Sequence, residues 1–301
     1  MVSGLELARW REESKKSAIA LSIPPQEVDW LLQSLAGLSP LSLRLESYKT
    51  DAEIPLRVSF SELKQLWEKR LQDRIPVQYL VGETPWRDLI LKVSPAVLIP
   101  RPETEMLVEL ALNYGAEAFS TGHWVDLGTG TGAIALSLAK ALPNAKIHAV
   151  DNSPEALTIA RENAENLGLV NQIEFHQGSW FSPLSHLQGK ISVMVSNPPY
   201  IPTATLAELQ PEVRQHEPLT ALDGGNDGLE AIRHLVNTAP QFLHSGGLWL
   251  VEMEARQGDA VKKLLTENGH YHLIAIHKDL AGIERFALAY VRKSVSDHYD
   301  G

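Results

Sequence analysis

Residues 124–140 read WVDLGTGTGAIALSLAK, a short apolar stretch followed by closely spaced glycines and then by an apolar segment. The pattern predicts a strand over Trp124–Leu127, a glycine loop, and a helix over Ala133–Leu142. Glycines between a strand and a helix let the backbone pass close to a ligand and turn sharply. This stretch therefore predicts an α/β fold with a ligand site at the end of a strand.

Strands and helices continue to alternate after this loop. Lys146–Val150 is expected to be the next strand, and Ser153 with Pro154 is typical of a helix start. The further predicted strands are Ile173–His176, Ile191–Ser196, Leu248–Met253, Tyr271–His277 and Arg285–Val291. Such alternation predicts a parallel, Rossmann-like, seven-stranded sheet covered on both faces, with the last two strands forming an antiparallel hairpin.

The N-terminal quarter of the chain has a different pattern. Apolar residues recur there at three- and four-residue spacing, with breakers between the segments, as expected for a small bundle of short helices. Prolines and Gly82 then interrupt short apolar runs, which favours a linker containing a β-hairpin. We therefore predict a helical domain over 1–75, a linker over 76–102 and the α/β domain over 103–301.

Asp151 ends the predicted strand after the glycine loop, 23 residues beyond Gly128. A carboxylate there can accept hydrogen bonds from both hydroxyls of a ribose, so the loop and Asp151 together predict a site for an adenosine-bearing cofactor. Gly128-x-Gly130-x-x-Ala133 also satisfies the dinucleotide fingerprint. An NAD-dependent oxidoreductase is therefore a rival from another enzyme class, and this motif alone does not decide between the two.

Asn197-Pro198-Pro199-Tyr200 follows the fourth strand of the alternating region. The two prolines stiffen the segment and remove two N–H donors, leaving the Asn197 side-chain oxygen and the Pro198 carbonyl as acceptors. Two acceptors suit a planar, conjugated NH2 group, and Tyr200 can lay its ring against it. An electrophilic methyl donor would then need only positioning, without a metal or a strong base. A dehydrogenase has no use for this constellation.

The composition excludes several other classes of protein. The chain has no cysteine, hence no disulfide and no thiolate site, and its eleven histidines lack the spacing of metal ligands, so no metal is expected. No apolar run is long enough for a membrane span, and no secretory signal is present, which is compatible with the cytoplasm. Residues 81–301 hold the whole net charge of −10. An acidic surface disfavours direct nucleic-acid binding.

At this point the sequence resembles the protein-(glutamine-N5) methyltransferases that modify peptide chain release factors (HemK/PrmC type). The similar stretches, between about residues 74 and 288, are RIPVQYLVGE, VLIPRPETEMLVE, VDLGTGTGAIALSLA, AVDNSPEAL, SWF, VSNPPYI, HEPLTALDGGNDGL and DLAGIERF. The tetrapeptide alone is shared with adenine amino-methyltransferases. The segments PRPETE and EPLTAL are more particular to the release-factor enzymes.

The resemblance implies an S-adenosylmethionine-dependent enzyme that leaves S-adenosylhomocysteine as its product. It implies a cofactor pocket formed by Gly128, Thr129, Gly130, Thr131, Gly132, Asp151, Trp180 and Asn197. It also implies that Asn197, Pro198, Pro199 and Tyr200 hold the substrate glutamine of a Gly-Gly-Gln motif, with catalytic roles for Asn197, Pro198 and Tyr200. The helical domain would help to dock the release factor.

The sequence departs from the family pattern in two places. Glu254 stands where the family has glycine, and the first 75 residues match poorly. Two rival functions stay open at this point: an amino-methyltransferase acting on adenine in DNA or RNA, and a catalytically silent cofactor-binding module.

Overall fold

The computed structural model describes residues 1–292, which divide into two compact units. The first contains Met1–Glu83 together with Gln210–His216, and the second contains Thr84–Leu209 and the chain from Glu217 onward. Residues 76–83 thus belong to the helical unit, together with a segment from much later in the chain. The division of the chain into domains over 1–75, 76–102 and 103–301 therefore remains a prediction from the sequence. Residues 293–301 of the last range lie outside the part of the chain that the structure describes.

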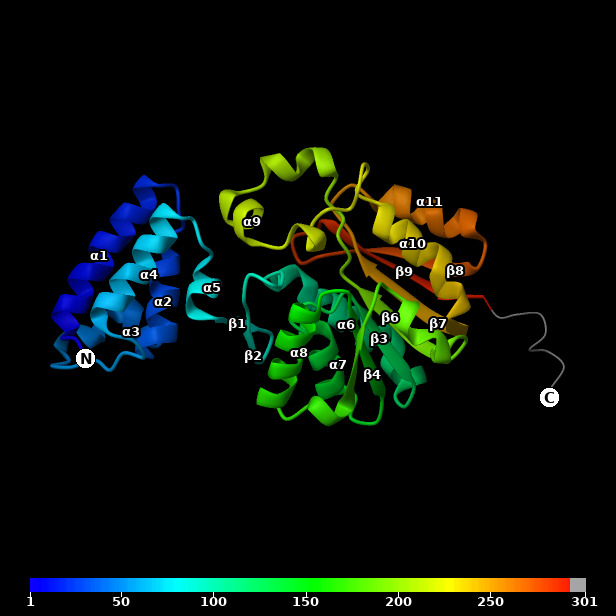
Figure 1. Ribbon diagram of the computed structural model, residues 1–301, viewed down its shortest axis with the longest axis horizontal. Coiled ribbons are helices and arrows are strands. Elements are labelled where there is room, and N and C mark those ends of the chain that lie inside the picture. The colour runs from blue at the N-terminus through cyan, green and yellow to red at the C-terminus, as the bar shows by residue number, and fades with distance from the viewer. Residues whose placement is uncertain (293–301) are drawn as a thin grey trace. The chain divides into compact units, whose positions relative to one another are not determined.

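The first unit is a bundle of short helices, as the helical spacing predicted (Figure 1). Its helical segments are α1 (Gly4–Ala20), α2 (Gln26–Ala36), α3 (Pro40–Leu45), η1 (Ser47–Thr50), α4 (Phe60–Gln72), α5 (Val77–Val81) and α9 (Pro211–His216). At the start of α4, the Ser59 hydroxyl accepts from the Glu62 N–H, and the Glu62 carboxylate accepts from the Ser59 N–H. This capping box satisfies two backbone donors that the helix leaves free. The apolar faces of the helices form a core of their own.

Arg70 is the most deeply buried cation of the helical unit. Its side chain is 2% exposed, and its guanidinium donates to Glu27 at 2.5 and 3.0 Å and to Glu212 of α9 at 2.8 Å. Arg74 also contacts Glu212, at 2.8 Å, and the His216 ring nitrogen lies 2.7 Å from the Asp73 carbonyl oxygen. These polar contacts hold α9 on the bundle.

We expect Arg70→Met to lower the free energy of unfolding by about 3 kcal/mol, because it leaves two partly buried carboxylates without their counter-charge. Urea denaturation followed by circular dichroism measures the change. Arg57→Met is the matched control: Arg57 is largely exposed and pairs with Glu83, so its loss should change stability by less than about 0.5 kcal/mol. Equal stability of the Arg70→Met variant and the parent would contradict this account of how α9 is held.

The second unit is built on a seven-stranded sheet in the order β5-β4-β3-β6-β7-β9-β8. The strands are β3 (His123–Leu127), β4 (Lys146–Asp151), β5 (Ile173–Gln177), β6 (Ile191–Ser196), β7 (Leu243–Glu252), β8 (Tyr271–Lys278) and β9 (Glu284–Val291). The first five strands are parallel to one another, whereas β9 runs antiparallel to both β7 and β8. The predicted Rossmann-like sheet and its antiparallel C-terminal hairpin are confirmed.

Helices cover both faces of this sheet (Figure 1). One face packs against α6 (Glu105–Phe119), α7 (Ala133–Ala141) and α8 (Pro154–Asn166), and the other against α10 (Glu230–Thr238) and α11 (Gly258–Asn268). Successive strand residues point to opposite faces, so Trp124 belongs to the first core and Val125 to the second. Two apolar layers fix the strands and therefore the loops at their carboxyl ends.

A small hairpin precedes the sheet, as predicted. It is formed by β1 (Glu83–Trp86) and β2 (Leu89–Lys92). The Asn163 side chain of α8 accepts from the Lys92 N–H at 2.6 Å and donates to the Lys92 carbonyl oxygen at 3.1 Å, which holds β2 beside the helix. Short 3-10 segments complete the unit: η2 (Pro102–Thr104), η3 (Val170–Gln172), η4 (Ser182–Leu187), η5 (Thr203–Glu208), η6 (Leu219–Ala221) and η7 (Ala239–Gln241). None of the helices in residues 1–292 is both long and apolar enough to span a bilayer.

Candidate functional site

The glycine loop connects the end of β3 to the start of α7. Gly128, Gly130 and Gly132 have φ angles of +79°, +53° and +83°, in the left-handed region that favours glycine. The N–H groups of Gly128 and Thr129 both donate to the Val150 carbonyl oxygen, at 2.9 and 3.0 Å, and Gly132 caps α7. The loop is thereby fixed against the end of β4, with its backbone turned toward the carboxyl edge of the sheet.

A cavity of about 360 Å³ opens at this edge, within the second unit. It is lined by Ala96, Val97, Leu98, Gly128, Gly130, Val150, Asp151, Asn152, Ser153, Glu155, Ala156, Gly178, Ser179, Trp180, Asn197, Pro199, Pro218, Thr220 and Ala221. The ends of β3, β4 and β6 and the segment after β5 meet here, as expected where parallel strands end together. Most of the sequence-predicted residues therefore surround one space.

Three predicted cofactor residues support the loop instead of lining the cavity. The Thr129 hydroxyl donates to the buried Asp126 carboxylate at 2.6 Å, and the Thr131 carbonyl oxygen accepts from Asn163 at 2.9 Å. Gly132 stands at the start of α7. The Asp126 carboxylate, a residue not predicted to belong to the site, also accepts from the Ala135 N–H at 3.2 Å, and burial raises the pKa of Asp126 to about 7. These contacts fix the glycine loop through residues that do not line the cavity.

Asp151 stands at the end of β4, on the wall of the cavity. Its Oδ2 accepts from the Gly130 N–H at 2.9 Å, and its Oδ1 accepts from the Ser153 N–H at 3.0 Å. Burial raises the pKa of Asp151, although these backbone donors oppose the rise. An ionised carboxylate has about four lone-pair sites, so two are left for hydroxyl donors. The position is the one predicted for a carboxylate that binds a ribose.

Asn197 is the first residue after β6 and also lines the cavity. Its Nδ2 donates to the Thr104 hydroxyl at 3.1 Å. This contact fixes the amide, so that its Oδ1 is presented as an acceptor. Pro199 lines the same space, whereas Pro198 is buried. The structure thus brings the tetrapeptide next to the predicted cofactor residues.

Tyr200 is turned toward a buried acid. Its hydroxyl donates to Glu252 Oε1 at 3.2 Å, at the end of β7, and its carbonyl oxygen accepts from Gln257 at 3.1 Å. Burial raises the pKa of Glu252 to about 7, while hydrogen bonding from Thr104 and Tyr200 and the charge of Arg285 lower it. Burial and the neighbouring Glu252 charge raise the pKa of Tyr200. Thr104 and Glu252 therefore form a polar network behind the tetrapeptide.

We expect this buried acid to make stability depend on pH. The pKa of Glu252 is about 7 in the folded chain and close to 4.5 when unfolded. The folded state thus binds more protons between these values, and stability falls as pH rises through this window. Glu252→Gln should remove the contribution of this acid to the fall in the free energy of unfolding, which is on the order of 3 kcal/mol over the whole window. Thermal unfolding from pH 4.5 to pH 8 measures it, with Glu267→Gln, an exposed acid, as the control.

If the parent and Glu252→Gln proteins show the same pH dependence, Glu252 is not the acid described here. Asp126 contributes in the same direction, because its pKa is also raised to about 7, whereas histidines whose pKa values are lowered by burial, such as His148 and His176, contribute in the opposite direction. The difference between the parent and the variant therefore measures the part that Glu252 contributes.

The departure at Glu254 is accommodated in a tight turn. The Gln257 side chain accepts from the Glu254 N–H at 3.0 Å, and the Gln257 N–H donates to the Glu254 carbonyl oxygen at 3.1 Å. The same Gln257 amide donates to the carbonyl oxygens of Tyr200 and Gly228. Glu254 is half-buried, and the turn after β7 still supports the tetrapeptide.

Two wall segments were not predicted as cavity residues. Ala96–Leu98 and Pro218–Ala221 lie far from the glycine loop in the sequence, and their small and apolar side chains carry no chemical signature. Just outside the two segments, Arg101 contacts the buried Glu217 at 2.6 Å, and this ion pair links the adjoining parts of the chain. The only signal was that both belong to stretches on which the family resemblance rested, VLIPRPETE and HEPLTAL.

The cavity residues fit an adenosine-bearing cofactor. The volume lies within the range of small-molecule sites, and the cavity is at the strand ends where such sheets bind ligands. A side chain at Gly128 would meet the Trp180 ring at 3.8 Å, so glycine leaves the space beside that ring open. Asp151 supplies acceptors for hydroxyls, and Trp180 supplies a flat apolar wall. The described residues around the cavity contain no group of metal ligands; such a group is found elsewhere on the sheet.

Comparison with known proteins agrees with this site. A family of methyltransferase domains matches residues 119–286. A release factor glutamine methyltransferase from Synechocystis sp. is 50% identical over 96% of this chain and 97% of its own length. Another, from Thermosynechococcus vestitus, is 47% identical over 88% of this chain and 90% of its own length.

A solved structure of the hMettl16 catalytic domain in complex with MAT2A 3′UTR hairpin 6 is similar in fold, with a TM-score of 0.55. It is 15% identical and covers 81% of this chain and 86% of that one, so it bears on the fold alone. The two release factor glutamine methyltransferases, in contrast, are similar to this chain over 96% and 88% of its length. The chain belongs to the release factor glutamine methyltransferase family.

Proposed function

We propose that this chain transfers a methyl group from S-adenosylmethionine to the side-chain amide nitrogen of the glutamine in the Gly-Gly-Gln motif of peptide chain release factors. The observation that carries the proposal is the orientation of Asn197. Its Nδ2 is held by Thr104 at the wall of the cavity, which leaves its Oδ1 to accept from a substrate NH2. The full-length relatives, named for this reaction, supply the substrate class.

The chain's own residues would bind and orient the two substrates. Asp151 would accept from the ribose hydroxyls, and Trp180 would pack against the adenine. When bound, S-adenosylmethionine supplies a methyl group on a positively charged sulfur and leaves as S-adenosylhomocysteine. The glycine loop keeps the backbone clear of side chains at this point.

Asn197 Oδ1 and the Pro198 carbonyl oxygen would accept from the two amide hydrogens. Acceptors on both hydrogens favour a pyramidal nitrogen, whose lone pair would then be free to attack the methyl group. Bound S-adenosylmethionine would supply that methyl group and keep the electrons of its S–C bond, and the extra proton on the amide nitrogen would leave to water. Raised pKa values make Tyr200 unsuited to act as a base, so we assign it to positioning.

Thr104 and Glu252 would act as positioning residues through Asn197 and Tyr200. Both are buried, at 4% and 1% exposure. In the same proposal, the helical domain over 1–75 docks the release factor, and the reaction takes place in the cytoplasm without a metal or direct nucleic-acid binding.

Transfer to adenine in DNA or RNA is the alternative with the same donor and tetrapeptide. It is disfavoured by the acidity of residues 81–301, which hold 16 Lys and Arg against 26 Asp and Glu. A silent cofactor-binding module is disfavoured by the presence of the complete tetrapeptide, of which Asn197 and Pro199 line the cavity.

Radiolabelled S-adenosylmethionine distinguishes these functions. We expect label on a purified release factor, none on its variant with alanine for the Gly-Gly-Gln glutamine, and none on duplex DNA, single-stranded DNA or RNA. Label on nucleic acid would favour the alternative, and no label on any acceptor would favour the silent module.

A further inference from the structure

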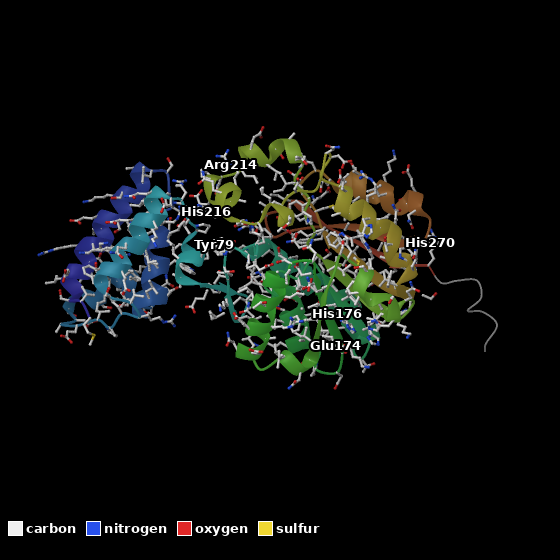
Figure 2. The ribbon with its side chains drawn as sticks, in the orientation of Figure 1. Tyr79, Glu174, His176, Arg214, His216 and His270 are labelled. Atoms are coloured by element: carbon white, nitrogen blue, oxygen red, sulfur yellow. The ribbon has the colours of Figure 1, made fainter. Side chains whose placement is uncertain are left out.

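Three histidines that do not line the cavity form a row across the sheet. His123 of β3, His148 of β4 and His176 of β5 come from neighbouring strands, and the ring centroids are 5.2 and 5.3 Å apart. Glu174 of β5 is the register partner of His148 and lies two residues before His176. The sheet therefore gathers two imidazoles and a carboxylate at one place on its β5 edge. Figure 2 shows Glu174 and His176 together there.

The three ligand atoms have the spacing of one face of a coordination tetrahedron. His148 Nδ1 lies 3.1 Å from His176 Nε2 and 3.5 Å from Glu174 Oε2, and the latter two atoms are 3.9 Å apart. Ligands at zinc–nitrogen and zinc–oxygen bond lengths in a tetrahedral site are separated by about 3.3 Å. Shifts of a few tenths of an ångström would place all three at bonding distance from one ion.

The row also contains the outer partner that a metal-bound histidine needs. His148 Nε2, the nitrogen that does not face Glu174, lies 2.9 Å from His123 Nδ1. A hydrogen on His148 Nε2 donated to His123 leaves the lone pair of His148 Nδ1 directed at the site. Such an outer hydrogen bond fixes the tautomer and the ring orientation of a ligand.

We propose that His148, His176 and Glu174 bind one divalent transition-metal ion, with Zn²⁺ as the best match to two imidazoles and a carboxylate. Three protein ligands leave a fourth position for water. The side chains of His148 and His176 are 1% and 16% exposed, whereas that of Glu174 is 63% exposed, so an ion can enter from the Glu174 side.

The ion would join β4 to β5 close to the cofactor cavity. His148 lies three residues before Asp151, and His176 lies two residues before Gly178, which also lines the cavity. The Gly178 N–H donates to the Asp151 carbonyl oxygen at 3.0 Å, so the two strand ends are already linked there. A bound ion stabilises this corner of the sheet by mass action and has no part in methyl transfer.

This site was not predicted from the sequence, which led us to expect no metal. The ligands at 148, 174 and 176 come from two strands, so the distance between them in the chain has none of the spacings that identify zinc sites. Only the parallel pairing of β4 with β5 brings them together.

The test is Zn²⁺ binding to untagged, chelator-treated full-length protein, measured by competition with a chromophoric chelator. We expect one ion per chain, a higher midpoint of thermal unfolding with Zn²⁺, and the visible absorption of four-coordinate Co²⁺ when that ion is used. Loss of the outer partner of a metal ligand weakens binding about 10- to 100-fold, so we expect His123→Phe to weaken Zn²⁺ binding within this range or by less. His176→Gln and Glu174→Gln each remove a ligand and should weaken binding at least as much as His123→Phe. His176 and Glu174 are at the open edge, so these variants avoid replacing the buried His148.

His270→Gln is the control, because His270 is an exposed histidine of the same unit that lies well away from the row (Figure 2). It should bind Zn²⁺ as the parent does. Absence of stoichiometric binding to the parent would overturn the proposal, as would unchanged affinity of the His176→Gln and Glu174→Gln variants. None of these results depends on methyl transfer, so the failure of this proposal and the failure of the proposed function are separate outcomes.

Discussion

Asn197→Ala is expected to lower the rate of methyl transfer by about 1,000-fold at saturating substrates, because the variant loses a fixed acceptor on the reacting NH2. Binding of S-adenosylhomocysteine should stay within about threefold of the parent, since Asn197 is one of many residues around the cavity. Transfer of label to a release factor measures the rate, and titration calorimetry measures the binding. Asn237→Ala, an exposed asparagine on α10, is the control.

Thr104→Val separates positioning from direct contact. The variant keeps Asn197 but removes the hydroxyl that accepts from its Nδ2, so we expect a loss of about 10-fold in kcat with little change in binding. Full activity of Asn197→Ala would remove Asn197 from the mechanism. Full activity of Thr104→Val together with a dead Asn197→Ala would show that the side chain needs no support from Thr104.

Asp151→Ala is expected to weaken binding of S-adenosylmethionine by at least about 100-fold, because two hydrogen bonds to a charged acceptor are lost. Asp151 also accepts from Gly130 and Ser153, so the loop itself should loosen. Asp151→Asn preserves the shape and one acceptor, and should lie between the parent and Asp151→Ala. Calorimetric titration measures all three proteins.

The matched control for Asp151 is Asp259→Ala, at the exposed first turn of α11. At saturating cofactor, the kcat of Asp151→Asn should recover to within a few-fold of the parent, since the carboxylate does not contact the substrate amide. Unchanged cofactor affinity in both Asp151 variants would contradict the assignment of Asp151 to the ribose.

The sheet could be predicted because each strand has a simple signal. β6 begins and ends at the predicted residues, Ile191 and Ser196, since it is apolar throughout and is followed by prolines. β7 begins at Leu243, five residues before the predicted start, because its early part contains His244, Ser245 and two glycines. There the strand is specified by pairing with Ile191 and not by its own composition.

The residues of the candidate site could be predicted where they stand at a strand end and belong to a motif, such as the glycine loop, the acid at the end of the next strand, or the tetrapeptide. Gly128, Asp151 and Asn197 meet that condition, and the structure brings them to one cavity. Thr104 and Glu252 do not: a threonine and a glutamate at element ends are common, and their burial beside the tetrapeptide depends on how distant segments pack. The sequence alone also has no signal that α9 would pack with the helical unit, because this depends on Arg70 and Glu212, 142 residues apart.

In the proposed reaction, the methyl group is placed on one amide nitrogen of a release factor. The most direct measurement is mass spectrometry of peptides from a release factor incubated with this protein and S-adenosylmethionine, beside the same reaction with Asn197→Ala. We expect one added methyl group on the side chain of the Gly-Gly-Gln glutamine with the parent protein, and no detectable methylation with the variant over the same incubation. A methyl group on another residue, or an unmodified release factor despite turnover of the cofactor on another acceptor, would contradict it.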